Sequence, residues 1–289
     1  MSETPQTWTI ETVLRWATED FRGRGIESPR LDAEVLLAHA LTTTRVKLIV
    51  EARRSLDPSE LARFRGMVKR RRTREPVAYL VGAREFYGRS FRVDGRVLIP
   101  RPDTETLVDV ALARTRSCSM SMRALDLCTG SGCVAITLVR ERPTSRVVAA
   151  DLSPEALVLA RDNAQRLGAY NIAFRQADLF SGLEPLGPFD VVTANPPYIA
   201  TAEVGSLQPD IRDFEPRVAL EAGPGGLEVV RRVVGGAPAA LVHGGVLAVE
   251  VGVGQADAAR ALFEESGFEG IEVARDYGRI ERVVSGVLR

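Results

Sequence analysis

The feature that most constrains the fold is an alternation of strand-like and helix-like stretches beginning near residue 103. The strand-like stretches are short and apolar, and they span 124–127, 146–150, 171–175, 189–193 and 246–251. Stretches with helical spacing lie between them at 131–141, 153–168 and 226–241. Such alternation is typical of a parallel sheet covered by helices on both faces. We therefore predict an α/β fold, with two more strands at 271–274 and 282–287.

The first 80 or so residues have a different texture, because their apolar residues recur at helical spacing. Asp57-Pro58-Ser59-Glu60 predicts a helix start, with Asp57 as the N-cap and Glu60 completing a capping box. That helix runs into a basic stretch at 69–74. A solvated helix end, favoured by the helix dipole, explains this stretch; contact with an acidic or RNA-bearing partner is the alternative. Further on, Asp94-Gly95 predicts the turn of a hairpin between 85–93 and 96–99.

Composition narrows the class of protein. The 38 basic residues balance the 38 acidic ones, so charge gives no argument for nucleic-acid binding. No apolar run approaches the ~20 residues that span a bilayer, and the polar start lacks the pattern of a secretory signal. Cys118, Cys128 and Cys133 are odd in number, and none has metal-ligand spacing with His39 or His243. We expect a cytoplasmic protein without a metal and without membrane contact.

Three acidic or glycine-rich positions follow successive predicted strands. The first is the turn Asp126-Leu127-Cys128-Thr129-Gly130-Ser131-Gly132, where backbone N–H groups at a helix start suit a carboxylate or phosphate. Asp151 ends the next strand, where an acid can accept hydrogen bonds from both hydroxyls of a ribose; an N-cap role is the alternative. Asp178 follows the third strand, where an acid can meet an adenine amino group.

Asn195-Pro196-Pro197-Tyr198 directly follows the apolar strand at 189–193. The two prolines end the strand and remove two backbone donors, leaving the Asn195 oxygen and a proline carbonyl as acceptors. Such acceptors suit a planar –NH2 group, on which positive charge grows during methyl transfer. Tyr198 is expected to supply a flat wall for this group.

These motifs resemble those of class I S-adenosylmethionine methyltransferases that act on planar nitrogen. More closely, and over nearly the whole chain, they are similar to HemK-type peptide chain release factor glutamine N5-methyltransferases. Phe86-Tyr87-Gly88-Arg89-Ser90-Phe91, Ile99-Pro100-Arg101-Pro102-Asp103-Thr104-Glu105 and the Asn-Pro-Pro-Tyr motif carry this resemblance. It implies a helical substrate-recognition domain at 1–80, a hairpin linker at 81–102, and a catalytic domain at 103–289 with a seven-stranded, mostly parallel, Rossmann-like sheet whose last strand is antiparallel.

The resemblance also implies roles for single residues. S-adenosylmethionine would be held by Cys128, Thr129, Gly130, Ser131, Gly132, Asp151, Asp178, Leu179 and Asn195, with Leu179 beside the adenine. Asn195, Pro196, Pro197 and Tyr198 would be the catalytic residues that grip the glutamine amide, and the implied partner is a release factor. Cys128 departs from the family, which has glycine there, so we expect either a negative φ or a shifted turn.

Other activities share parts of this pattern. A glutamine methyltransferase acting on a ribosomal protein is the nearest, although Pro102-Asp103-Thr104-Glu105 favours the release-factor group. DNA and RNA amino-group methyltransferases also contain Asn-Pro-Pro-Tyr, but the zero net charge and the lack of a nucleic-acid-reading motif disfavour them. A binding module without catalysis is disfavoured by the intact motif.

Overall fold

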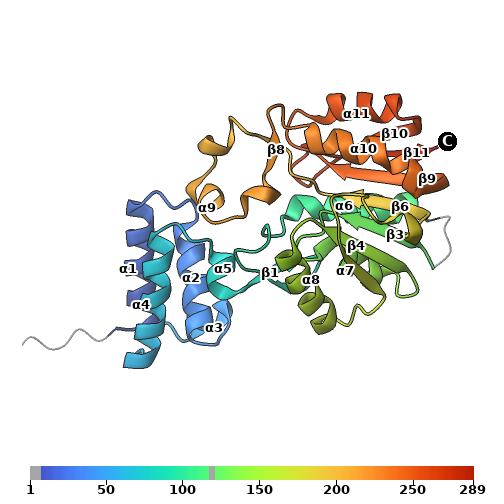
Figure 1. Cartoon of the computed structure of the whole chain (residues 1–289). Helices are drawn as coiled ribbons and strands as arrows, with labels where there is room; N and C mark the ends of the chain where they lie inside the picture. The colour runs from blue at the N-terminus through green and yellow to red at the C-terminus, as the bar shows by residue number, and fades with distance from the viewer. Residues whose placement is uncertain (1–7, 117–120) are drawn as a thin grey trace, which may run out of the picture. The chain divides into compact units, whose positions relative to one another are not determined.

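The computed structural model describes residues 8–116 and 121–289, and the chain divides into two compact units (Figure 1). The first comprises Met1–Gly82 and Pro209–Phe214, and the second Ala83–Gln208 and Glu215–Arg289. The segment Pro209–Phe214 thus belongs with the N-terminal helices, although the sequence analysis placed it in the catalytic domain. Cys118 lies outside the described residues.

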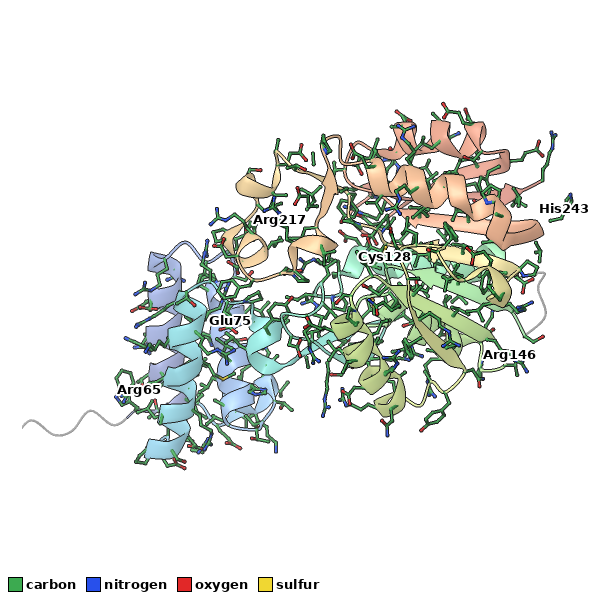
Figure 2. The ribbon with its side chains drawn as sticks, in the orientation of Figure 1. Arg65, Glu75, Cys128, Arg146, Arg217 and His243 are labelled. Carbon is green, nitrogen blue, oxygen red and sulfur yellow. The ribbon has the colours of Figure 1, made fainter. Side chains whose placement is uncertain are left out.

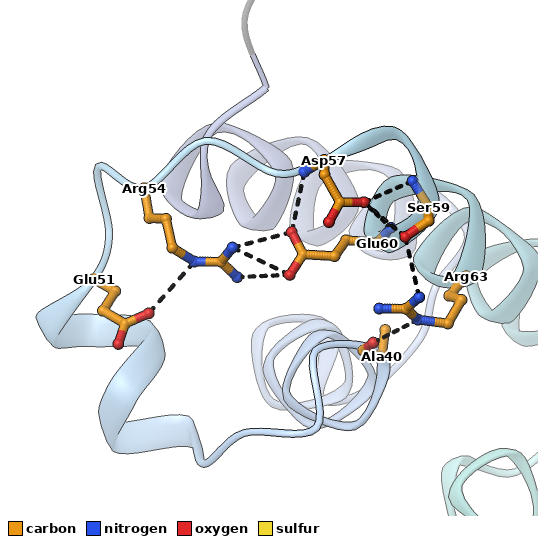
Figure 3. Close-up of polar contacts among 7 residues, drawn as sticks. All are labelled: Ala40, Glu51, Arg54, Asp57, Ser59, Glu60 and Arg63. Carbon is orange, nitrogen blue, oxygen red and sulfur yellow. Dashed lines mark hydrogen bonds and ion pairs between the residues drawn. The ribbon is translucent and has the colours of Figure 1, made fainter.

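Helices make up the first unit, around a core that includes Phe21, Leu36, Leu37 and Phe64. They are α1 (Ile10–Gly23), α2 (Pro29–Ala40), α3 (Arg45–Val50), α4 (Pro58–Arg72), α5 (Val77–Val81) and α9 (Pro209–Arg212). The capping box predicted for α4 is confirmed. Asp57 accepts the backbone N–H of Ser59 and of Glu60 at 2.7 and 2.8 Å, and Glu60 accepts the N–H of Asp57 at 3.0 Å (Figure 3).

The basic stretch at the end of α4 is solvated in part, since Lys69 and Arg70 are exposed, but its arginines also form ion pairs. Arg70 pairs with Glu75, and Arg72 pairs with Asp20 at 2.8 Å. Two further carboxylates, Asp32 and Asp210, hold the buried Arg71 at 2.8 and 2.6 Å. The sequence did not predict the buried Arg71, because its partners Asp32 and Asp210 come from distant parts of the chain. These arginines are therefore occupied within the helical unit.

Seven strands form the sheet of the second unit, in the order β10-β11-β9-β6-β3-β4-β5. Their bounds are β3 (Arg123–Leu127), β4 (Arg146–Asp151), β5 (Ile172–Gln176), β6 (Phe189–Ala194), β9 (Leu241–Glu250), β10 (Phe268–Arg275) and β11 (Glu281–Leu288). Only β11 runs antiparallel to its neighbours, β9 and β10. The predicted class I methyltransferase sheet is confirmed.

Helices cover both faces of this sheet (Figure 1). On one face, α10 (Glu228–Ala240) and α11 (Ala256–Glu265) pack on the core that contains Leu125 and Leu127 of β3. The other face carries α6 (Glu105–Arg114), α7 (Cys133–Glu141) and α8 (Pro154–Arg166), over the core that contains Ala124. Because side chains alternate along a strand, β3 contributes to both cores.

The hairpin has a different turn from the one predicted. Strands β1 (Ala83–Phe86) and β2 (Arg89–Arg92) are joined by Tyr87 and Gly88, whose φ angles are 51° and 67°. Two successive positive φ angles match the right-handed twist of paired strands. The Asp94 carboxylate instead accepts the backbone N–H of Arg96 at 3.1 Å, a local turn that leads into residues lining the cavity described below.

Several short elements in the second unit were not predicted. Strands β7 (Ile199–Ala200) and β8 (Glu221–Gly223) pair in parallel after the Asn-Pro-Pro-Tyr motif. Single turns of 3-10 helix occur at η1 (Pro102–Thr104), η2 (Glu184–Leu186), η3 (Val204–Ser206) and η4 (Arg217–Ala219). Among the described helices of the whole chain, none is long and apolar enough to cross a membrane.

Candidate active site

A cavity of about 250 Å³ lies in the second unit, at the carboxyl ends of β3, β4 and β6. Figure 2 labels Cys128 at this edge of the sheet and Arg146, the first residue of β4, toward the opposite edge. Nine of the predicted site residues line the cavity: Cys128, Thr129, Gly130, Ser131, Asp151, Asp178, Leu179, Asn195 and Pro197. Gly132, Pro196 and Tyr198 do not line it.

The buried Asp126 side chain holds the glycine-rich turn through hydrogen bonds. Its carboxylate accepts the hydroxyl of Thr129 at 2.6 Å and that of Thr193, in β6, at 2.8 Å. Burial raises the pKa of Asp126 to about 6 in spite of these donors. Asp126 therefore joins β3, the turn and β6, a role that its position at a strand end did not reveal.

The backbone N–H groups of the turn are mostly occupied within the protein, in contrast to the expectation that they face a ligand. Thr129 N–H donates to the carbonyl of Ala150 at 3.0 Å, and Gly132 N–H donates to the carbonyl of Thr129 at 2.8 Å. Gly130 N–H donates to the Asp151 carboxylate at 2.8 Å. The turn thus supports Asp151 rather than offering a row of free donors.

Asp151 is the last residue of β4 and borders the cavity. Besides Gly130, its carboxylate accepts the backbone N–H of Ser153 at 2.9 Å. Ser153 itself is the N-cap of α8, accepting the N–H of Ala156 at 3.1 Å, so the alternative capping role of Asp151 is wrong. Burial raises the pKa of Asp151, and the two backbone donors oppose this shift.

Cys128 adopts a φ of 55°, so the negative φ expected as one possibility is wrong. It takes the left-handed backbone that favours glycine, at an energetic cost for a residue with a side chain. Burial and nearby acids raise the pKa of its thiol, and burial raises that of Cys133 to about 12. Both thiols are therefore protonated at neutral pH and poorly suited to nucleophilic attack.

Gly132 is the N-cap of α7 and does not line the cavity. A Cβ atom there would lie 2.9 Å from Ile136 Cδ1 and 3.2 Å from the Cβ of Ala160 in α8. The glycine therefore allows α7 and α8 to approach closely. Its part in the site is the packing of these two helices.

At one side of the cavity, Asp178 and Leu179 lie together. The Asp178 carboxylate pairs with Arg232 of α10 at 2.8 Å, and both side chains are about half exposed. Leu179 is buried and has a φ of 53°. Arg232 also lines the cavity, and the sequence analysis did not identify it because arginine is abundant throughout the chain.

Asn195 lies at the other side, where β6 ends. Its Nδ2 atom donates to the Thr104 hydroxyl at 3.2 Å, and Asn195, Thr104 and Pro197 all line the cavity. The Tyr198 hydroxyl lies 3.5 Å from Glu250, and burial raises the Tyr198 pKa to about 12. Tyr198 does not line the cavity, so it does not form the flat wall that was expected of it.

Comparisons with known proteins find relatives over nearly the whole chain. Residues 12–82 match the family described as PrmC N-terminal domain, and residues 119–224 match the family described as methyltransferase domain. The release factor glutamine methyltransferase of Geobacter sulfurreducens is 44% identical over 288 residues, which cover 99% of each chain. That of Rhodopirellula baltica is 40% identical, covering 98% of this chain and 97% of the relative.

The chain belongs to the release factor glutamine methyltransferase family. Among solved structures, the hMettl16 catalytic domain in complex with the MAT2A 3′UTR hairpin 6 is similar at a TM-score of 0.57. It is 15% identical, and the match covers 74% of this chain and 81% of that one, a likeness that shows the fold alone.

The structure adds two candidate functional residues that were not predicted from the sequence, Thr104 and Glu250. Thr104 contacts Asn195 from η1, and Glu250 contacts Tyr198 from the end of β9. Thr104 lies within a motif that carried the family resemblance, which was the available signal. Nothing local to Glu250 marks it, because its neighbours in space are far away in sequence. Among the described residues, no cluster of His, Cys, Asp and Glu is suited to a metal.

Proposed function

We propose that this methyltransferase transfers a methyl group from S-adenosylmethionine to the side-chain amide nitrogen of a glutamine in a peptide chain release factor. One observation carries the proposal: Asn195 and Asp151 line the same cavity, and the Asn195 Nδ2 atom donates to the Thr104 hydroxyl, which occupies one end of its side-chain amide. The cavity is therefore lined both by Asn195, an acceptor for the amide N–H of the substrate, and by Asp151, an acceptor for the ribose hydroxyls of the cofactor.

The residues of the cavity suit S-adenosylmethionine, which supplies an electrophilic methyl group when bound. Asp151 presents a carboxylate where the ribose hydroxyls would lie. Leu179 and Ala177 offer apolar surface for the adenine, and Asp178 is an acceptor within reach of its amino group. Cys128, Thr129 and Gly130 would border the methionine part. Apolar surface with a few placed polar groups is typical of cofactor pockets.

Asn195 and the prolines of its motif would bind the substrate amide. An amide nitrogen is a weak nucleophile, because its lone pair is delocalised into the carbonyl. Asn195 Oδ1 and a proline carbonyl accept its two N–H groups and become better partners as positive charge grows on the nitrogen. Orientation in the cavity and this charge stabilisation supply the rate, and the proton leaves to solvent afterwards.

The glutamine is proposed to lie in an exposed Gly-Gly-Gln loop of the release factor. Glycines beside the target would let the loop approach the prolines of the motif without steric conflict. The family supports a release factor as substrate, since the relatives are named for it. A free glutamine has the same amide, so surface beyond the cavity must select the protein.

One assay tests the proposal against its competitors. The enzyme receives labelled S-adenosylmethionine with a release factor, a ribosomal protein or DNA in parallel, and mass spectrometry locates the methyl group. We expect label on a release-factor glutamine alone, and none with Asn195→Ala. Label on a DNA adenine, on a ribosomal protein, or on a residue other than glutamine would overturn the proposal.

A further inference from the structure

The two prolines of the Asn-Pro-Pro-Tyr motif take their position from the residues on either side of them. On one side, Asn195 directly follows β6 and donates to the Thr104 hydroxyl at 3.2 Å. Pro196 and Pro197 have no backbone N–H, so neither can donate a backbone hydrogen bond of its own. The position of their carbonyls, one of which is the proposed acceptor for the substrate amide, therefore depends on how Tyr198 is held.

Gln255 fixes the backbone directly after the prolines. Its Nε2 atom donates to the Tyr198 carbonyl at 2.9 Å and to the carbonyl of Gly226, just before α10, at 3.4 Å. Its Oε1 atom accepts the N–H of Gly252, just after β9, at 2.9 Å. The partners fix the orientation of this side-chain amide, because two carbonyls require a donor and an N–H requires an acceptor. Three segments distant in sequence thus meet on one side chain.

The backbone around Gln255 is packed too closely for further side chains. Gly226 has a φ of 76°, and a Cβ atom there would lie 2.9 Å from the Tyr198 carbonyl oxygen and 3.1 Å from Gln255 Nε2. A Cβ atom on Gly252 would lie 3.1 Å from Tyr198 Cδ2 and 3.0 Å from Gln255 Oε1. The two glycines therefore allow the Gln255 amide to reach the backbone of the motif.

The stability of its own helix does not account for the Gln255 side chain. Gln255 is the N-cap of α11, a position where Ser, Thr, Asp or Asn commonly accepts the first free N–H groups of the helix. The Gln255 side chain makes no such bond and contacts the Tyr198 carbonyl instead. Gln255 does not line the cavity, whereas Asn195 and Pro197 do. Its effect on the site therefore passes through the motif.

We propose that Gln255 is a positioning residue, which holds the Tyr198 carbonyl and thereby sets where the proline carbonyl meets the substrate amide. The proposal rests on the function proposed above and adds to it the device that places the second acceptor. The prolines make the link stiff, because their rings fix φ near about −65° and leave few free rotations between Asn195 and Tyr198. A shift of the Tyr198 carbonyl therefore moves the proline carbonyls as well.

The first test is Gln255→Met, which keeps the length of the side chain and removes its three hydrogen bonds. We expect kcat to fall roughly 10- to 100-fold, because a misplacement of about 1 Å can cost ~10²-fold in rate. The affinity for S-adenosylmethionine should change less than about twofold, since Gln255 does not line the cavity. Asn171→Leu is the matched control, because it removes a donor to the Pro143 carbonyl at 2.8 Å, away from the cavity, and should leave kcat unchanged. A Gln255→Met enzyme with more than half of the wild-type kcat would overturn the proposal.

The second test is the pH profile of Gln255→Glu. The introduced carboxyl can donate to the Tyr198 carbonyl only when it is protonated, and it repels that oxygen when it is ionised. The ratio of variant to wild-type kcat should therefore fall about tenfold as pH rises from about 5 to about 8. Asn171→Asp makes the same exchange of amide for carboxyl away from the cavity, and its ratio should not change with pH. A Gln255→Glu ratio that does not change with pH would assign Gln255 a purely structural role and overturn the proposal.

The third test compares two glycines that have the same backbone conformation. Gly226→Ala places a Cβ atom against the Tyr198 carbonyl, whereas a Cβ atom on Gly244, whose φ is 77°, has nothing within 4 Å. Both variants carry the same left-handed strain. Only Gly226→Ala should lower kcat, because only its Cβ atom displaces the motif. Equal kcat values in the two variants would overturn the proposal.

A fourth measurement separates this inference from the proposed function, because it needs no release factor. The Tyr198 carbonyl carbon is observed by NMR through the amide of Ile199, the next residue, and its chemical shift reports the hydrogen bond that the carbonyl accepts. The signal should move in Gln255→Met, and in Gln255→Glu it should titrate together with the kcat ratio. Failure of the wild-type enzyme to methylate a release factor would overturn the function alone. A Tyr198 signal that is unchanged in both variants would overturn the positioning role alone.

Discussion

Asp151 is the residue on which the cofactor assignment most depends. Asp151→Ala should weaken binding of S-adenosylmethionine by about 1.5–3 kcal/mol, the range for hydrogen bonds to a charged group. Calorimetry on the folded variant measures this. Asp190→Ala is a suitable control, since Asp190 likewise accepts a backbone N–H, from Arg123 at 2.7 Å, at the opposite edge of the sheet. Unchanged affinity in Asp151→Ala would remove this residue from the site.

Asn195 is expected to matter for turnover more than for cofactor binding. Its oxygen stabilises charge that develops during the reaction, so Asn195→Ala should lower kcat by about 10²–10³, as for loss of one preorganised polar partner. Single-turnover kinetics measure this, with calorimetry to show that the cofactor still binds. Asn171→Ala, at the start of β5 and away from the cavity, should leave kcat unchanged. More than half of the wild-type turnover in Asn195→Ala would contradict the proposed chemistry.

Cys128 permits a test of backbone strain. Glycine is usually about 0.4–1 kcal/mol less stabilising than alanine, because it gives the unfolded chain more freedom. At a φ of 55° the order should reverse. We expect Cys128→Gly to be about 1 kcal/mol more stable than Cys128→Ala, since only alanine retains the left-handed strain. Denaturant unfolding of the two variants measures the difference, and the usual order would contradict the assigned backbone.

Among the helices, α4 depends on a buried ion pair near its end. Arg71→Ala leaves the carboxylates of Asp32 and Asp210 without their shared cation. The free energy of unfolding should therefore fall by about 3–5 kcal/mol, the range for breaking a buried pair. Arg15→Ala removes an exposed pair with Glu11 and should change it by less than about 1 kcal/mol. Equal effects in urea titrations of the two variants would show that the Arg71 pair contributes no more than a surface pair.

Some elements of the fold could be predicted from their sequence, and others could not. The sheet strands could be predicted, because each is a short apolar run bounded by turn residues. The hairpin turn was wrong because Asp94-Gly95 satisfies a local rule, whereas Tyr87 takes a positive φ that its side chain disfavours. At the site, Asp151 and Asn195 follow strands and could be predicted as neighbours. Arg232 and Glu250 could not, since only the folded chain brings them there.

At the scale of the whole molecule, we expect loss of the helical unit to remove substrate recognition and to leave cofactor binding intact. Both cores of the second unit and every residue lining the cavity lie at or after residue 86. Deleting 1–80 should therefore spare S-adenosylmethionine binding while abolishing methylation of an intact release factor. Calorimetry and the labelled-methyl assay measure the two properties. Full activity of the shortened chain on intact release factor would show that the helical unit plays no part in recognition.

The assignment of Pro209–Phe214 to the helical unit affects how these enzymes can exchange parts during evolution. The unit is encoded by two separate stretches of sequence, joined in space by the pairing of Arg71 with Asp210 at 2.6 Å. A recombination that replaced only 1–82 with the counterpart from a relative would leave Asp210 facing a foreign helix. Compatible chimeras should therefore need both stretches from the same parent.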